Sequence, residues 1–248
     1  MVNNSLQPHI TKGANVTAIP DGYRLAVPGI TSRTYLLVQL DDYTKYSRAN
    51  FPHRYSSIRL EARVSSASLP GTWGFGLWND PFGLNLGFTG SSMRLPALPN
   101  AAWFFYASSD NHLSFQDNKP ANGYLAQCFR SPTFDWRLAW IPFLLLFHRK
   151  SARKMLSRII QEDSALVELD VTQWQNYELE WGVEGTKFRA NNNMVVASLI
   201  SPKPPLGVVI WMDNQYAAFT PGGKLGIGVL DHPDPAWLEI RTLEIQDR

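Results

Sequence analysis

The stretch VTQWQNYELEWGVEGTKFRANNNMV, residues 171–195, decides the fold class. Apolar and acidic residues alternate over residues 177–181, which is the period of a strand with one buried face. The alternation resumes after Gly185, so that the expected buried side chains are Tyr177, Leu179, Trp181, Phe188 and Ala190. Three asparagines at 191–193 break the pattern. The stretch therefore predicts a β-hairpin with one dry face.

A second stretch, YSSIRLEARVSSASLPGTWGFGLWNDPF at residues 55–82, shows the same alternation. Its LEARV and GLW segments, together with YELEW and FRANNNMV of the hairpin, resemble the paired strands of the concanavalin A-like jelly rolls. The resemblance is to the laminarinase and carrageenase enzymes of glycoside hydrolase family sixteen in particular. It implies an all-β fold, an antiparallel two-sheet β-sandwich.

Short strand-like runs separated by Gly, Pro, Asn and Asp continue along the chain. They cover residues 35–40, 58–64, 72–78, 101–106, 113–115, 177–181, 187–190, 207–212, 225–229 and 237–245. Turn signals at this frequency favour a sandwich. Residues 1–20 are expected to form a loose arm or an edge strand, and residues 1–248 one domain.

Amino-acid composition limits the kinds of partner and the cellular compartment expected for this protein. The 248 residues are 44% apolar and 12% aromatic, enough for a large core. With 23 basic and 21 acidic residues, the chain has no general attraction for nucleic acid, and no nucleic-acid partner is expected. Cys128 is the single cysteine, and the N-terminal sequence MVNNSLQPHITKGANV lacks a secretion signal pattern. We therefore expect a cytoplasmic protein.

Residues 136–162, WRLAWIPFLLLFHRKSARKMLSRIIQE, interrupt the β pattern. Apolar residues recur there at helical spacing: Ala152, Met155, Leu156, Ile159 and Ile160. Basic residues lie on the opposite face: Arg149, Lys150, Arg153, Lys154 and Arg158. This pattern predicts one inserted amphipathic helical segment. Three roles remain open for it: packing over one sheet, contact with an anionic membrane surface, or a lid over an apolar ligand.

The resemblance also says where catalytic carboxylates are expected. Family-sixteen enzymes present them from one strand as Glu-x-Asp-x-x-Glu, one attacking the anomeric carbon and the other protonating the leaving oxygen. The corresponding stretch here, AAWFFYASSD at residues 101–110, contains no glutamate. The nearest match, ELDVTQ at residues 168–173, ends in glutamine and runs into Trp174, so we interpret it as a strand edge. The retaining mechanism of the family is therefore not expected.

The strand TWGFGLWND, residues 72–80, is the first candidate wall of a site. Alternation places Gly74, Gly76, Trp78 and Asp80 on one face. Two glycines on one face leave room for a ligand to approach the backbone, with Trp78 stacking on a sugar ring and Asp80 binding a polar edge. Alternatively, the glycines accommodate aromatic side chains of the next strand, and Asp80 begins a turn.

The strand GVVIWMDNQY, residues 207–216, is the second candidate wall, because it ends in polar side chains beside a tryptophan. A polar cluster that includes Tyr106 follows Trp103 and forms a third. The predicted ligand contacts are Trp78, Trp103, Tyr106, Trp211, Asn214, Gln215 and Tyr216. The alternative for residues 213–216 is an Asx turn that ends the strand.

Three functions follow from these features. The first is recognition of a carbohydrate or glycolipid-like amphiphile on an aromatic groove. The second is an enzyme that acts on a hydrophobic small molecule or glycoside, with Asp80 and Asp213 converging as an acid-base pair. The third is a peripheral membrane or interaction protein that uses the basic helix face. No residue spacing indicates a metal site or a cofactor, and none is predicted.

Overall fold

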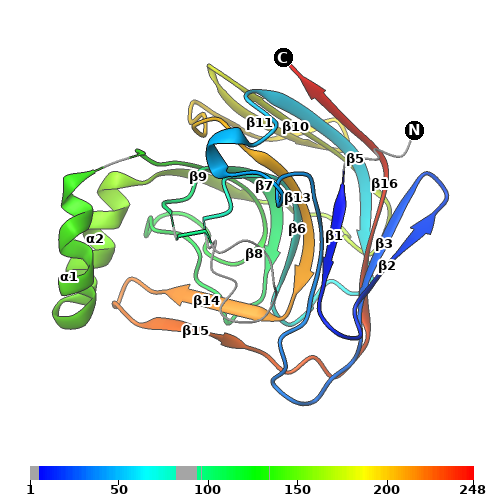
Figure 1. Ribbon diagram of the computed structural model, residues 1–248, viewed down its shortest axis with the longest axis horizontal. Coiled ribbons are helices and arrows are strands. Elements are labelled where there is room, and N and C mark those ends of the chain that lie inside the picture. Colours follow the sequence, from blue (N-terminus) through cyan, green and yellow to red (C-terminus); the bar gives the residue numbers. More distant parts are fainter. Residues whose placement is uncertain (1–5, 82–93, 96, 134) are drawn as a thin grey trace.

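A computed structural model describes residues 6–81, 94–95, 97–133 and 135–248 of the chain. Two large antiparallel sheets stack face to face, and a small hairpin and two helices lie at one end (Figure 1). The two-sheet sandwich predicted from the alternating runs is confirmed. Its sheets are called the inner and the outer sheet below.

The inner sheet has seven strands. In spatial order these are β1 (Gln7–Ile10), β4 (Leu37–Asp41), β13 (Gly207–Asp213), β6 (Thr72–Trp78), β7 (Ala101–Ala107), β8 (Gly123–Arg130) and β9 (Gln161–Leu166). The face that points away from the outer sheet is called the concave face, because the sheet bows around it (Figure 1).

The outer sheet also has seven strands. In spatial order these are β12 (Asn193–Ser198), β11 (Gly185–Ala190), β10 (Gln175–Gly182), β5 (Ser56–Val64), β16 (Ala236–Asp247), β3 (Gly22–Val27) and β2 (Asn15–Ile19). A two-stranded hairpin of β14 (Gln215–Phe219) and β15 (Leu225–Val229) stands apart from both sheets. Residues 7–10 and 15–19 thus form edge strands, one in each sheet.

The predicted hairpin is the pair β10–β11. Tyr177 lies opposite Ala190 and Leu179 opposite Phe188, so the alternating apolar side chains share one face. Asn191 and Asn192 adopt φ of 49° and 64°. This left-handed conformation, which asparagine tolerates better than most residues, ends β11. The chain then returns as β12.

The core between the sheets is rich in aromatic rings. β6 contributes Phe75, whose ring lies 5.1 Å from that of Tyr177 in the outer sheet. β7 contributes Phe104, which meets Phe188 edge to face at 5.3 Å. The Phe75–Tyr177 and Phe104–Phe188 pairs each join the inner sheet to the outer sheet. The apolar faces of β6, β7, β10 and β11 therefore pack against one another at one interface.

The inserted segment is helical over most of the predicted range. It comprises a 3₁₀ turn η2 (Trp136–Trp140), α1 (Ile141–Phe147) and α2 (Arg149–Ile159); a further short turn, η1 (Arg48–Asn50), lies elsewhere. The prediction is wrong at its C-terminal end, because residues 161 and 162 belong to β9. Glu162 lies opposite Phe129 of β8 there. Pairing with β8 overrides the helical spacing that continues through Ile160.

α2 packs over the concave face. Leu156 contacts the apolar cluster of that face, and Ile160 lies within it. Of the three roles left open by the sequence, packing over one sheet is therefore seen. The predicted basic face needs a correction, because Arg153 is buried and donates to the backbone carbonyls of Ser114 and Phe219 at 2.7 and 2.9 Å. Its guanidinium fastens α2 to the loop between β7 and β8 and to β14.

Candidate functional site

Three tryptophans predicted as ligand platforms meet on the concave face. Trp78 of β6 and Trp211 of β13 stack with ring centroids 6.0 Å apart and an interplanar angle of 7°. Trp103 of β7 tilts against both, at 6.0 Å from Trp78 and 5.7 Å from Trp211. The three indoles and Phe105 form what we call the tryptophan cluster.

The two glycines of β6 make room for this cluster. A Cβ atom at Gly74 would lie 2.9 Å from Cη2 of Trp211, and one at Gly76 would lie 2.7 Å from Cβ of Trp103. The interpretation in which these glycines let a ligand reach the backbone is therefore wrong, because neighbouring aromatic side chains fill the space. The alternative, in which they accommodate large side chains, is confirmed.

The three tryptophans of the cluster differ in how far their side chains are exposed to solvent. Trp103 and Trp211 are each 7% exposed. Side chains from surrounding segments pack in or against the same cluster, among them Tyr43, Leu113, Phe115 and Leu156. Trp78 is only half-buried. Among the three platforms, Trp78 thus offers the largest surface to a ligand.

Each of the other two indoles is tied to a carboxyl group through a neutral side chain. Nε1 of Trp103 donates to Gln127 at 3.2 Å, and Nε2 of Gln127 donates to Glu162 at 3.0 Å. Glu162 is buried and also accepts the backbone N–H of Phe115 at 2.8 Å. Burial raises the pKa of Glu162. The sequence analysis missed Glu162 and Gln127, because it assigned residue 162 to the helix and did not recognise β8.

In the same way, Trp211 is linked through Thr72 to the carboxyl group of Asp213. Nε1 of Trp211 donates to Oγ1 of Thr72 at 2.9 Å, and Thr72 donates to Asp213 at 2.8 Å. The Asp213 carboxyl also accepts the backbone N–H of Gln215 at 3.3 Å, the contact of an Asx turn. Burial raises the pKa of Asp213 to about 7. A neutral, protonated carboxyl is therefore favoured at this end of the face below neutral pH.

We expect Asp213→Asn to stabilise the protein at high pH but not at low pH. The unfolded carboxyl ionises near pH 4 and the folded one near pH 7. The folded state therefore binds more protons between these values, and stability falls as pH rises through this window. The asparagine side chain does not ionise, so the variant does not lose this stability as pH rises. Chemical unfolding should show the variant gaining about 2 kcal/mol over the parent between pH 4 and pH 8, because partial solvation reduces the full three-unit linkage.

The exposed residue Asp234 supplies a matched control, since the structure shows no hydrogen bond to its side chain among the described residues. Asp234→Asn, a surface substitution, should change stability by less than about 0.5 kcal/mol. A flat difference curve for Asp213→Asn would show that the Asp213 carboxyl titrates normally in the folded protein.

The predicted convergence of Asp80 and Asp213 on one ligand is wrong. β6 and β13 are antiparallel, with Thr72 opposite Asp213 and Trp78 opposite Gly207. Asp80 therefore lies beyond the opposite end of the strand pair, roughly 25 Å from Asp213 at the usual rise per residue. Its carboxylate instead accepts Nη1 of Arg94 at 2.8 Å. Whether either carboxyl takes part in catalysis stays a prediction.

β7 is the strand on which the resemblance to family-sixteen enzymes predicts catalytic carboxylates, and it presents none. Ala101, Trp103, Phe105 and Ala107 point to the concave face. Among the described strands, β4 brings Asp41 to this face, β9 brings Glu162 and β13 brings Asp213. Glu162 and Asp213 are four strands apart. Four strand spacings span roughly 19 Å. Glycosidase pairs need about 5–10 Å, so these two groups do not form one.

The remaining predicted contacts lie elsewhere. Tyr106 faces the sandwich interior, where its ring stacks on Trp73 at 5.9 Å, because β7 alternates. Asn214 is buried and holds three backbone groups, those of Thr34, Leu36 and Leu230. Gln215 and Tyr216 belong to β14. The ring of Tyr216 packs over Gly228. Tyr106 and Asn214 are thus engaged within the protein.

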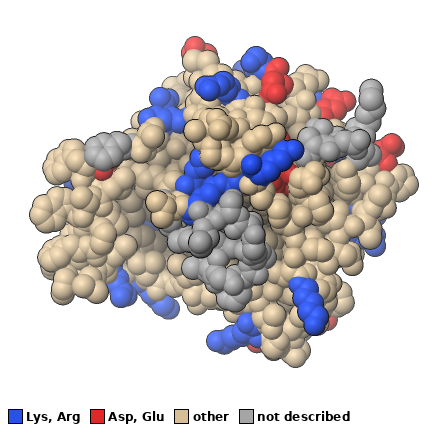
Figure 2. Space-filling view, in the orientation of Figure 1, with Lys and Arg blue, Asp and Glu red and all other residues tan. Residues whose placement is uncertain are grey.

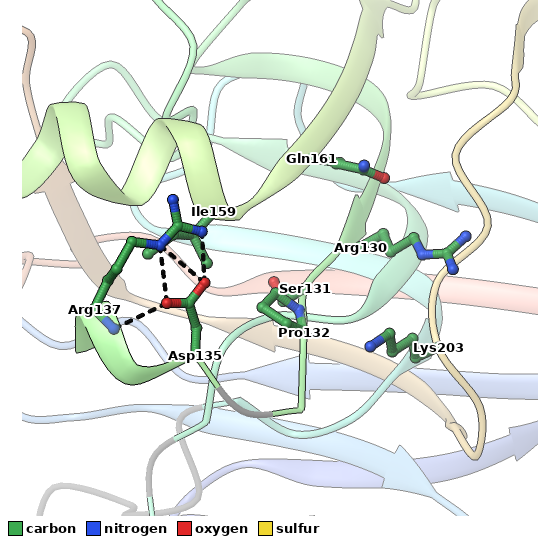
Figure 3. A pocket seen from close by; sticks show the side chains of 8 residues that line it. All are labelled: Arg130, Ser131, Pro132, Asp135, Arg137, Ile159, Gln161 and Lys203. Carbon is green, nitrogen blue, oxygen red and sulfur yellow. Dashed lines mark hydrogen bonds and ion pairs between the residues drawn. The ribbon is translucent and has the colours of Figure 1, made fainter. Parts of the chain in front are cut away.

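A small basic pocket lies just beyond the concave face, where β8 ends and β9 begins (Figure 3). Its volume is about 290 Å³, and its lining includes Arg130, Lys203 and an ion pair of Arg137 with Asp135 at 2.6 Å. Arg137 lies on one side, and Arg130 and Lys203 on the other (Figure 3). Three cations against one carboxylate suit an anionic group. Nowhere in the described part of the chain do three or more His, Cys, Asp or Glu side chains form a group able to hold a metal ion.

Solved structures share this architecture. A glycoside hydrolase family 16 endo-glucanase from Bacteroides ovatus is 11% identical, with a TM-score of 0.52, 97% of this chain covered and 94% of that chain. A Crh5 transglycosylase is 10% identical, with a TM-score of 0.51, 98% of this chain covered and 84% of that chain. No protein-family model and no curated protein matches the sequence. The chain has the concanavalin A-like jelly-roll fold.

Proposed function

We propose that the concave face binds carbohydrate and does not hydrolyse it. The observation that carries this proposal is a cluster of three tryptophans on a face whose β7 strand carries no carboxylate. Trp78, the half-buried member, provides an apolar plane for the C–H face of a sugar ring. Carbohydrate is chosen among ligands with flat apolar faces because the two similar structures are those of an endo-glucanase and a transglycosylase.

Polar side chains flank the cluster on the β4 side. Gln39 lies opposite Trp211, and His9 of β1 lies opposite Gln39. Both are half-buried. Gln39 donates to Asp41 at 2.8 Å, which fixes its amide carbonyl in one orientation. A ligand on Trp78 therefore has hydrogen-bonding groups at the β4 margin of the cluster, the arrangement of an orienting site.

We expect Trp78→Ala to weaken oligosaccharide binding about 30-fold. A tryptophan anchor at an interface contributes about 2 kcal/mol or more, and 1.4 kcal/mol corresponds to a factor of ten in affinity. A glycan array would identify the oligosaccharide, and calorimetry would compare the variants. Trp237→Ala is the matched control: Trp237 is also half-buried but lies on the outer sheet, and its loss should leave affinity unchanged.

Two results would contradict the proposal. One is equal affinity in the parent and Trp78→Ala proteins while Trp237→Ala binds weakly. The other is the appearance of shorter oligosaccharides by chromatography after prolonged incubation with the purified protein, which would show cleavage.

A further inference from the structure

The helical lobe carries an unusual apolar surface. Five large side chains of η2 and α1 are more than half exposed: Trp136, Trp140, Phe143, Leu146 and Phe147. They fall within residues 136–147, and the lobe stands out at the far left of Figure 1. Figure 2 shows its surface as mostly uncharged. Contiguous exposed patches of this kind mark interaction surfaces in soluble proteins.

The charged residues within the helical segment itself all have one sign. Residues 136–161 contain no aspartate or glutamate. Four exposed cations follow the patch on α2: Arg149, Lys150, Lys154 and Arg158. The other two cations of the segment are engaged, Arg137 with Asp135 and Arg153 with Asp117 and two backbone carbonyls. The patch therefore has four exposed cations at its margin, and the two carboxylates that contact the segment, Asp135 and Asp117, are each paired with one of its arginines.

We propose that η2 and α1 dock on an anionic phospholipid surface. Tryptophan and phenylalanine side chains partition into the headgroup region, and leucine reaches the acyl boundary. The cations of α2 then attract anionic headgroups. The inserting element is α1, whereas the sequence analysis placed the membrane contact on the basic face of α2. None of the described helices is long and apolar enough to cross a membrane.

The charges favour a lipid surface over a second copy of this chain. Two copies joined through this patch would bring four exposed cations of one protomer against four of the other, without a carboxylate from the same segment to pair with them. Like charges at an interface oppose association. An anionic bilayer supplies the complementary charge along the whole margin.

Vesicle co-sedimentation of the full chain tests the proposal, with phosphatidylcholine vesicles prepared with and without phosphatidylserine. The parent protein should bind only the anionic vesicles, and the binding should weaken as salt rises. Phe143→Ser with Leu146→Ser should weaken binding at least tenfold at every salt concentration. Arg149→Glu with Lys150→Glu should weaken it at least tenfold at low salt.

Val183→Ser is the control, since Val183 is an exposed apolar residue in the turn between β10 and β11. It should bind vesicles as the parent does. The proposal is overturned if the parent protein fails to bind anionic vesicles at low salt, or if the Phe143 and Leu146 double variant binds undiminished. It is also overturned if light scattering shows a dimer that this double variant abolishes while vesicle binding is absent.

Discussion

Trp181→Ala should lower the free energy of unfolding by about 3–5 kcal/mol, the cost of a large-to-small aromatic change in a packed core. Trp181 is fully buried on β10, and its ring lies 5.1 Å from that of Tyr55. Its Nε1 donates to the backbone carbonyl of Pro202 at 3.1 Å. Truncation therefore leaves a cavity and a buried carbonyl without its donor. Urea unfolding followed by circular dichroism measures the loss.

Trp237→Ala provides the comparison on the outer surface of the same sheet. The guanidinium carbons of Arg24 and Arg63 lie 4.8 and 5.4 Å from the Trp237 ring centroid. Such exposed cation–π contacts contribute about 0.5–1 kcal/mol each, so a loss of about 1–2 kcal/mol is expected. Equal losses for the two tryptophan variants would contradict the assignment of Trp181 to the core.

Arg153→Ala should cost about 3 kcal/mol, which is a large effect for a basic residue on a helix. The side chain is 3% exposed and donates to Ser114, Phe219 and Asp117. Removal leaves two backbone carbonyls without their charged donor, and breaking such a buried contact typically costs several kcal/mol. Thermal and urea unfolding would both report the change.

Lys154→Ala is the matched variant, because Lys154 is the next residue of α2, carries the same charge and is exposed. Surface substitutions of this kind usually change stability by less than about 0.5 kcal/mol. If Arg153→Ala is as mild as Lys154→Ala, the guanidinium does not fasten α2 to the loop between β7 and β8 and to β14.

Local alternation and turn signals were sufficient to predict several strands, including β6, which is buried on both faces. Residues 72–78 and 225–229 form strands with the predicted bounds, and residues 177–190 form the predicted hairpin. β8 was missed because GYLAQCFR is nearly continuously apolar and has no alternation to detect. β9 was missed because the helical spacing of α2 runs into it. Only its pairing with β8 makes residues 161–166 a strand.

The candidate site was predicted in part. The tryptophan cluster followed from placing Trp78, Trp103 and Trp211 on separate strands of one face. Alternation says which face a residue occupies, but it does not say which strands are neighbours or how they run. For this reason the antiparallel pairing that separates Asp80 from Asp213 was outside its reach. Arg153 was wrongly predicted to lie on an exposed face for a related reason. Helical spacing does not show that the carbonyls of Ser114 and Phe219 lie beside that face of α2.

The most direct test of carbohydrate recognition on the concave face is the indole N–H spectrum of the nitrogen-labelled protein during titration with an oligosaccharide. The chain has nine tryptophans, and single substitutions assign their signals. The signal of Trp78 should move first and furthest, with smaller shifts for its stacking partner Trp211, while that of Trp237 stays fixed. Shifts confined to Trp237 on β16 or Trp174 just before β10, or no shift in any indole, would contradict binding at the tryptophan cluster.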